Sequence, residues 1–166
     1  MTAVDDRVLT VFENLEVPEG YRAELIRGEI VMTAGPDKVH NVTVEAIRDQ
    51  IPRAHWHRLQ TQDLSMPGRL IPSSVATMVV EVVSRTSGDR DHRTKRQMYA
   101  EGGIPAYLIV DPVEGVCVLL AEPSDDRVLS RLPDYRAKRT SRFGDPIPVH
   151  VLGLTLETTD FQGYAD

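Results

Sequence analysis

Apolar positions at regular spacing divide the first third of the chain into helices and strands. A helical spacing predicts a helix from Val4 to Leu15, which Pro18-Glu19-Gly20 ends. Two alternating segments, Tyr21 to Ile26 and Glu29 to Thr33, predict a β-hairpin around Arg27-Gly28. The N-terminal part is therefore expected to be one helix followed by a two-stranded hairpin.

A second helix is predicted directly after the hairpin. Asp37 is suited to cap its N-terminus, and Pro52 is suited to end it. Two short strands, Leu59 to Ser65 and Arg69 to Ile71, are expected further along the chain. We expect the buried face of the helix to carry four residues: Val39, Val42, Ala46 and Ile47.

The strongest strand signal is the unbroken apolar segment from Met78 to Ser84. Its β-branched residues predict a strand that is buried on both faces of a sheet. A helix from Asp89 to Glu101, ended by Gly102-Gly103, is expected to follow, then strands over Ala106 to Asp111 and Val116 to Ala121. Further strands and loops continue to Leu156. This order predicts an α/β fold and a single domain over residues 1–166.

Composition narrows the class of protein. A length of 166 residues, with 41% hydrophobic and 27% charged residues, is ordinary for a globular domain. Cys117 is the only cysteine, which excludes an intramolecular disulfide and favours a reducing cytoplasm. No apolar stretch is long enough to span a membrane, and the first residues lack the apolar core of a signal peptide. The net charge of −6 argues against a uniformly basic surface, but it allows a local basic face.

One residue of the central strand requires a chemical explanation. Burying the Glu81 carboxylate in such a strand costs on the order of several kcal/mol, unless a cation or a metal compensates its charge. Lys95 lies on the next predicted element, where Asp91, Lys95 and Tyr99 share one helix face at i, i+4 and i+8. Two interpretations remain open: a catalytic site at Glu81, or a structural ion pair of Glu81 with Lys95 or Arg93.

Four segments carry a resemblance to a known family. They are the hairpin Tyr21 to Met32, the strand Val79 to Ser84, the block Asp91 to Pro112, and the ending Pro148 to Leu156. Together they resemble the Uma-type restriction endonucleases of the PD-(D/E)XK nuclease superfamily. The resemblance implies a restriction-endonuclease-like core, with a mixed central β-sheet flanked by helices. It also implies hydrolysis of DNA phosphodiester bonds that depends on Mg²⁺, or on Mn²⁺ in its place.

The resemblance also implies roles for four residues. Glu81 and Glu24 would ligate the metal, Lys95 would activate water or stabilise the phosphate, and His40 would be an accessory group. In the superfamily, the lysine lies two residues after the acid. Val83 occupies that position here, and the resemblance implies that Lys95 on the following helix takes the role of this lysine.

Two of these roles have simpler alternatives. Glu24 is equally explained as a strand residue paired with Arg22 or Arg27. His40 is equally explained as a partly buried structural histidine.

The sequence departs from the family at the first acid. Ser73, after Pro72, stands where the family has an aspartate, and a hydroxyl brings no charge to Mg²⁺. Either the primary metal ligand has been lost, or a loop that carries it is absent from this sequence. Asp63, one strand earlier, is a candidate substitute.

Basic residues lie in two places along this acidic chain. Those around the predicted site are the stronger candidates for contacts with a DNA backbone. The other group could also contact phosphates, but a solvated surface explains it better on an acidic protein. The first group is Arg90, Arg93, Lys95 and Arg96, and the second is Arg131, Arg136, Lys138, Arg139 and Arg142.

Three hypotheses for the function follow. The first is a metal-dependent DNA endonuclease, with DNA as its partner and no membrane association. The second is a catalytically inactive module of the same fold that binds nucleic acid or a protein. The third is a structural homodimer, which leaves the buried Glu81 unexplained.

Overall fold

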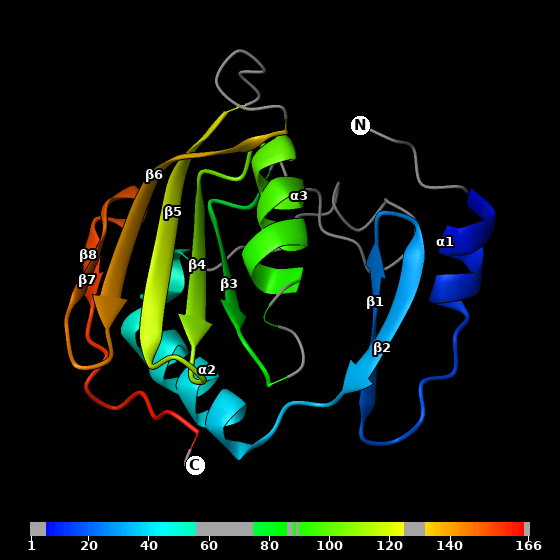
Figure 1. Cartoon of the computed structure of the whole chain (residues 1–166), viewed down its shortest axis with the longest axis horizontal. Coiled ribbons are helices and arrows are strands. Elements are labelled where there is room, and N and C mark those ends of the chain that lie inside the picture. The colour runs from blue at the N-terminus through cyan, green and yellow to red at the C-terminus, as the bar shows by residue number, and fades with distance from the viewer. Residues whose placement is uncertain (1–5, 56–74, 86–87, 89, 125–131, 165–166) are drawn as a thin grey trace. The chain divides into compact units, whose positions relative to one another are not determined.

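The structure of the chain is a computed structural model that describes residues 6–55, 75–85, 88, 90–124 and 132–164 (Figure 1). The chain divides into two compact units, Met1–Asp37 and Lys38–Asp166. The prediction of one domain over residues 1–166 stays a prediction.

The first unit contains a helix and a hairpin. α1 (Asp6–Glu13) precedes β1 (Tyr21–Ile26) and β2 (Glu29–Ala34), which pair in antiparallel register. The turn between the strands consists of Arg27 and Gly28, with φ values of 51° and 85°. Positive φ at both turn residues matches the twist of a two-residue hairpin, so the predicted turn position agrees with the structure.

The second unit is built around a four-stranded sheet in the order β3-β4-β5-β6. The strands are β3 (Met78–Val82), β4 (Ala106–Asp111), β5 (Val116–Ser124) and β6 (Asp134–Arg142). β3 and β4 are parallel, whereas the other two pairs are antiparallel. Parallel neighbours need a crossover, and here it carries the π-helical turn η4 (Arg90–Lys95) and α3 (Arg96–Glu101).

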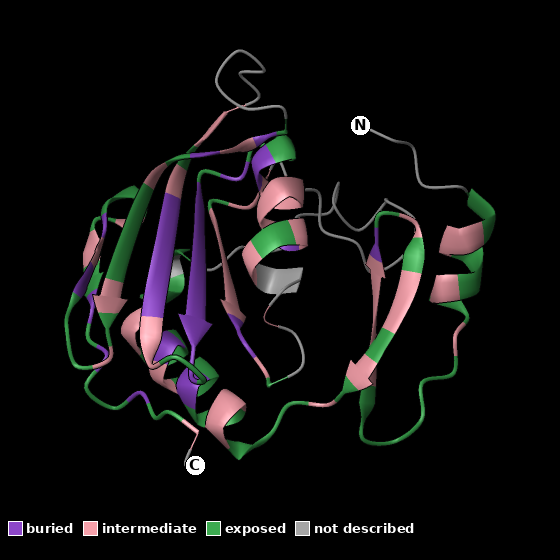
Figure 2. Ribbon diagram, viewed as in Figure 1, coloured by how far each residue is buried: buried purple, intermediate pink, exposed green. Residues whose placement is uncertain are grey.

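Helices cover both faces of this sheet. All six residues of β4 are buried (Figure 2). Leu108 and Val110 pack on one side with Ile47 of α2 (Lys38–Gln50), and Tyr107 and Ile109 pack on the other side with Ala100 of α3. This arrangement confirms the predicted α/β class, with a mixed central sheet flanked by helices.

Smaller elements complete the unit. The 3₁₀ turn η1 (Arg53–His55) follows α2. At the other end, β7 (Ile147–Val149), η5 (His150–Leu152) and β8 (Leu154–Leu156) form a second small sheet. Ile147, Val149 and Leu156 join the core on the α2 side of the main sheet.

The buried face of α2 differs from the prediction. Thr43 and Ile47 are buried, whereas Val42 is 40% exposed. Thr43 and Ile47 are four residues apart, so they share one helix face, and Val42 lies about 100° around the helix from Thr43. Ile47 is buried and Ala46 packs against the same core, as predicted, so the apolar pattern was wrong only at Val42 and missed Thr43.

Other boundaries also shifted. The helix predicted from Asp89 to Glu101 is π-helical over Arg90–Lys95 and α-helical only from Arg96. β3 ends at Val82, two residues before the predicted end. The strands predicted over Leu59 to Ser65 and Arg69 to Ile71 lie outside the described residues. In the described part of the chain, no helix is long and apolar enough to cross a membrane.

Cys117 provides a test of this core. Burial, together with the nearby Asp111 charge, raises the pKa of its thiol to about 12. Because the thiolate is the reactive form, we expect no alkylation of the folded protein by iodoacetamide at neutral pH. Mass spectrometry should show full labelling only after unfolding in guanidinium. Rapid labelling under native conditions would contradict the buried position of β5.

Candidate active site

Glu81 is the second-to-last residue of β3 and faces α3. It is in register with Ile109 of β4, and Ile109 belongs to the core between the sheet and α3. The next residue, Val82, belongs to the core on the opposite face. Since side chains alternate along a strand, the apolar run places this single carboxylate on the α3 side.

Two donors from the crossover bind the same oxygen of Glu81. Lys95 Nζ lies 3.1 Å from Glu81 Oε1, and the Tyr99 hydroxyl donates a hydrogen bond of 2.7 Å to that oxygen. The side chains of Lys95 and Glu81 are 4% and 17% exposed. The Tyr99 ring is also held edge-on against Tyr107, with 4.9 Å between ring centroids. Lys95 is thus almost fully buried against a carboxylate that still reaches the surface.

A second polar pair lies on the same face of the sheet. His92 Nε2 is 2.9 Å from Asp111 Oδ2, and the side chains are 35% and 6% exposed. Asp111 Oδ1 accepts hydrogen bonds from the backbone N–H groups of Val113 and Glu114. One side of the crossover therefore binds two acids on adjacent strands, through His92, Lys95 and Tyr99.

Sequence reasoning did not identify this His92–Asp111 pair. The only signal was the position of Asp111, at a strand end before Pro112, where an acid commonly caps a turn. Nothing in the sequence connected it to His92, because the pairing depends on the crossover returning alongside β4.

Two of the basic residues predicted to contact a DNA backbone are bound to acids. Lys95 is paired with Glu81, and Arg96 forms a two-fold contact with Asp134 at 2.6 and 2.8 Å. The Arg96 contact attaches the start of α3 to β6. Arg93 is exposed, whereas the side chains of Arg90 and Asp91 lie outside the described part.

The remaining predicted site residues lie elsewhere. Glu24 is in β1 of the first unit, 3.8 Å from Arg22, so its joint role with Glu81 stays a prediction. His40 lies in the first turn of α2 with a partly buried side chain. Asp63 and Ser73 lie outside the described residues. Both explanations of the missing aspartate therefore stay predictions.

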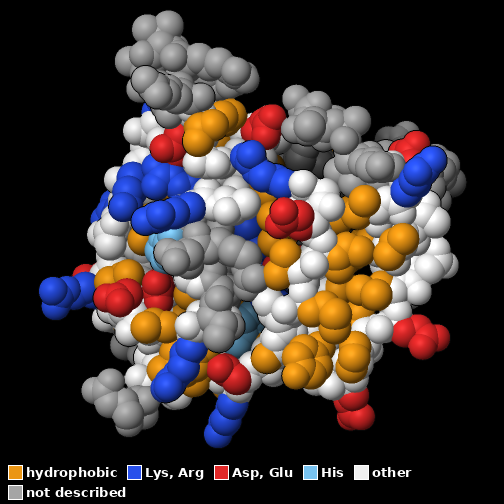
Figure 3. All heavy atoms as spheres, turned by 45° about the vertical axis from the view of Figure 1, so that its right-hand side comes forward, with side chains coloured by type: hydrophobic (Ala, Val, Ile, Leu, Met, Phe, Trp, Pro, Cys, Tyr) orange, Lys and Arg blue, Asp and Glu red, His pale blue; other side chains and the backbone are white. Residues whose placement is uncertain are grey.

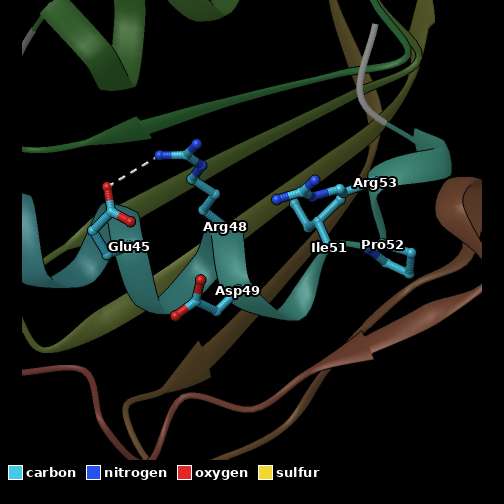
Figure 4. A pocket seen from close by; sticks show the side chains of 6 residues that line it. All are labelled: Glu45, Arg48, Asp49, Ile51, Pro52 and Arg53. Carbon is cyan, nitrogen blue, oxygen red and sulfur yellow. Dashed lines mark hydrogen bonds and ion pairs between the residues drawn. The ribbon is translucent and has the colours of Figure 1, made fainter.

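A pocket of about 420 Å³ lies on the α2 side of the sheet and not at Glu81 (Figure 4). Charged residues from the end of α2 line it, and Arg48 is 3.4 Å from Glu45 across the helix surface. The lining residues are Glu45, Arg48, Asp49, Ile51, Pro52 and Arg53. Arg48 is 55% exposed, so the ion pair with Glu45 stabilises the helix only weakly.

Comparison with protein families identifies the chain. Residues 66–159, more than half of its length, match the model of the Uma2 family, which is described as "putative restriction endonuclease". The chain belongs to this family, as the resemblance predicted, and its sheet and helices form a restriction-endonuclease-like fold. A search of curated proteins found no match.

The Glu81–Lys95 pair can be tested by stability measurements. Glu81→Gln leaves the buried Lys95 charge without its partner, so we expect a loss of about 3 kcal/mol or more. Lys95→Met should cost less, because Glu81 is closer to solvent and keeps Tyr99. The double variant should be more stable than the sum of the single losses predicts. Urea unfolding of the four proteins gives these values, and strictly additive losses would contradict the pairing.

Proposed function

We propose that this protein is a metal-dependent nuclease that hydrolyses phosphodiester bonds of DNA. Family membership supports a nuclease. The observation that carries the proposal is Glu81, a partly exposed carboxylate held in the central sheet by Lys95 and Tyr99. A purely apolar side chain would be the default at this strand position.

The chemistry of Glu81 fits a divalent cation such as Mg²⁺. Mg²⁺ is bound in proteins through one or two carboxylates and retains several waters. Lys95 and Tyr99 both contact Oε1 of Glu81, so Oε2 would be the ligand atom. When bound, such an ion supplies a nucleophilic hydroxide from water and charge neutralisation at the phosphate.

The protein side chains would perform the rest of the reaction. Tyr99 and Lys95 orient the carboxylate before substrate arrives, which reduces the cost of ordering it later. Lys95 would then place a positive charge beside the phosphate, where negative charge increases in the transition state. Glu24 as a further metal ligand and His40 as an accessory group remain part of this proposal.

The alternative is a module of the same fold that binds nucleic acid or a protein without turnover. One observation favours it: among the residues that the structure describes, no three His, Cys, Asp or Glu side chains gather as a ligand set. In that case the Glu81–Lys95 pair would serve stability alone.

Cleavage of supercoiled plasmid tests the nuclease. We expect nicking that requires Mg²⁺ or Mn²⁺ and falls about 100-fold or more in Glu81→Gln, because the metal ligand is removed. Lys95→Met should lower the rate with little change in metal affinity. Glu114→Gln is the matched control, since Glu114 is an exposed acid in the β4–β5 turn. A folded protein without activity in either metal would favour the binding module.

Metal binding can be measured without turnover. A cation that binds only the folded state raises the melting temperature, so Mg²⁺ or Mn²⁺ should stabilise the wild type. The same increase should be absent in Glu81→Gln and present in Glu114→Gln. An equal shift in both variants would place the metal away from Glu81.

A further inference from the structure

The register of the main sheet aligns Glu81 with residues at its far edge. Glu81 pairs with Ile109, Ile109 with Val118, and Val118 with Thr140 of β6. Paired residues point to the same face, so Thr140 shares the α3 face with Glu81. Three strand spacings separate them, which amounts to roughly 14 Å.

Basic residues flank Thr140 on this same face. Lys138 is in register with Leu120, and Leu120 with Tyr107. Arg142 is in register with Val116, and Val116 with Asp111, the partner of His92. Along β6 these two basic residues are four positions apart, which amounts to roughly 13 Å.

The basic end of β6 is open to solvent. α3 reaches the start of the strand, where Arg96 binds Asp134. Farther along, Lys138, Thr140 and Arg142 are all exposed. Figure 3 shows several Lys and Arg side chains close together on one part of the face that it draws, and others singly elsewhere on that face.

We propose that Lys138, Thr140 and Arg142 form a docking surface for the phosphodiester backbone of a nucleic acid. This proposal rests on the proposed function, for which it supplies the substrate-binding surface. A strand of B-form DNA advances about 3.4 Å per nucleotide, so the roughly 14 Å from Thr140 to Glu81 corresponds to about four nucleotides. The two basic residues and the hydroxyl donate to phosphate oxygens and hold the strand in position at Glu81.

Protection of a sheet edge is the competing explanation for these charges. Charged side chains on an edge strand prevent it from pairing with other molecules. That role does not depend on which face carries the charge, whereas backbone docking requires the Glu81 face. Arg139 provides the contrast, because it is exposed on the same strand but in register with Leu119 of the opposite core.

Binding measurements on matched double variants test the proposal. Lys138→Gln with Arg142→Gln removes two positive charges from the Glu81 face. The control double variant, Arg139→Gln with Arg48→Gln, removes two positive charges from the other side of the sheet. Arg48 belongs to that side because it lies on α2, which covers the opposite face. Fluorescence anisotropy with a labelled DNA duplex, a single strand and an RNA, in EDTA, gives affinity and its salt dependence without cleavage. Unchanged melting temperatures would show that all variants fold.

We expect the first double variant to lose about tenfold in affinity and nearly two units of salt slope on duplex DNA, because each phosphate contact contributes about 0.9. The control double variant should bind like the wild type. Equal losses in both, no loss in either, or no binding by the wild type would overturn the proposal. Plasmid cleavage is scored separately, so absence of turnover with preserved binding would reject the nuclease and keep the docking surface. The three probes identify which nucleic acid the surface prefers.

Discussion

The second unit depends on how the charge of Glu81 is compensated. A carboxylate inside an apolar strand is tolerated only when donors surround it, and Lys95 and Tyr99 supply them from a single helical face. Lys95 is even more buried than Glu81. Because the two charges compensate each other, removing either one alone leaves the other uncompensated. The crossover is therefore attached to the sheet through its polar site as well as through its apolar contacts.

The crossover is irregular where it carries the donors to Glu81. Its first residues form a π-helical turn and its remaining residues an α-helix. π-helical turns widen the helix locally and occur frequently at functional sites. Here the change falls between Lys95 and Arg96, which contact acids on different strands, Glu81 of β3 and Asp134 of β6. Two adjacent residues at this transition therefore bind acids on the two edge strands of one sheet.

The acids Glu81 and Asp111 lie on one face of this sheet. The α2 side is an apolar core that includes Leu108, Val110 and Ile147, and its buried threonine, Thr43, is the exception from α2. The α3 side holds Glu81, Asp111 and the exposed β6 residues Lys138, Thr140 and Arg142. Both faces carry an apolar core, and the α3 face is the one that the proposed nuclease function would use.

The sequence by itself determined the fold class, the strand that holds Glu81 and the bounds of β4, because long apolar segments and their flanking turns are local signals. It also pointed to Lys95 as the partner of Glu81, since an uncompensated carboxylate in a strand requires a nearby cation. Only the tertiary structure decided the His92–Asp111 pair, the Tyr99 contact and the alignment of β6 with Glu81. These depend on strand register and on the path of the crossover, which are set by packing between segments far apart in the sequence and leave no local pattern.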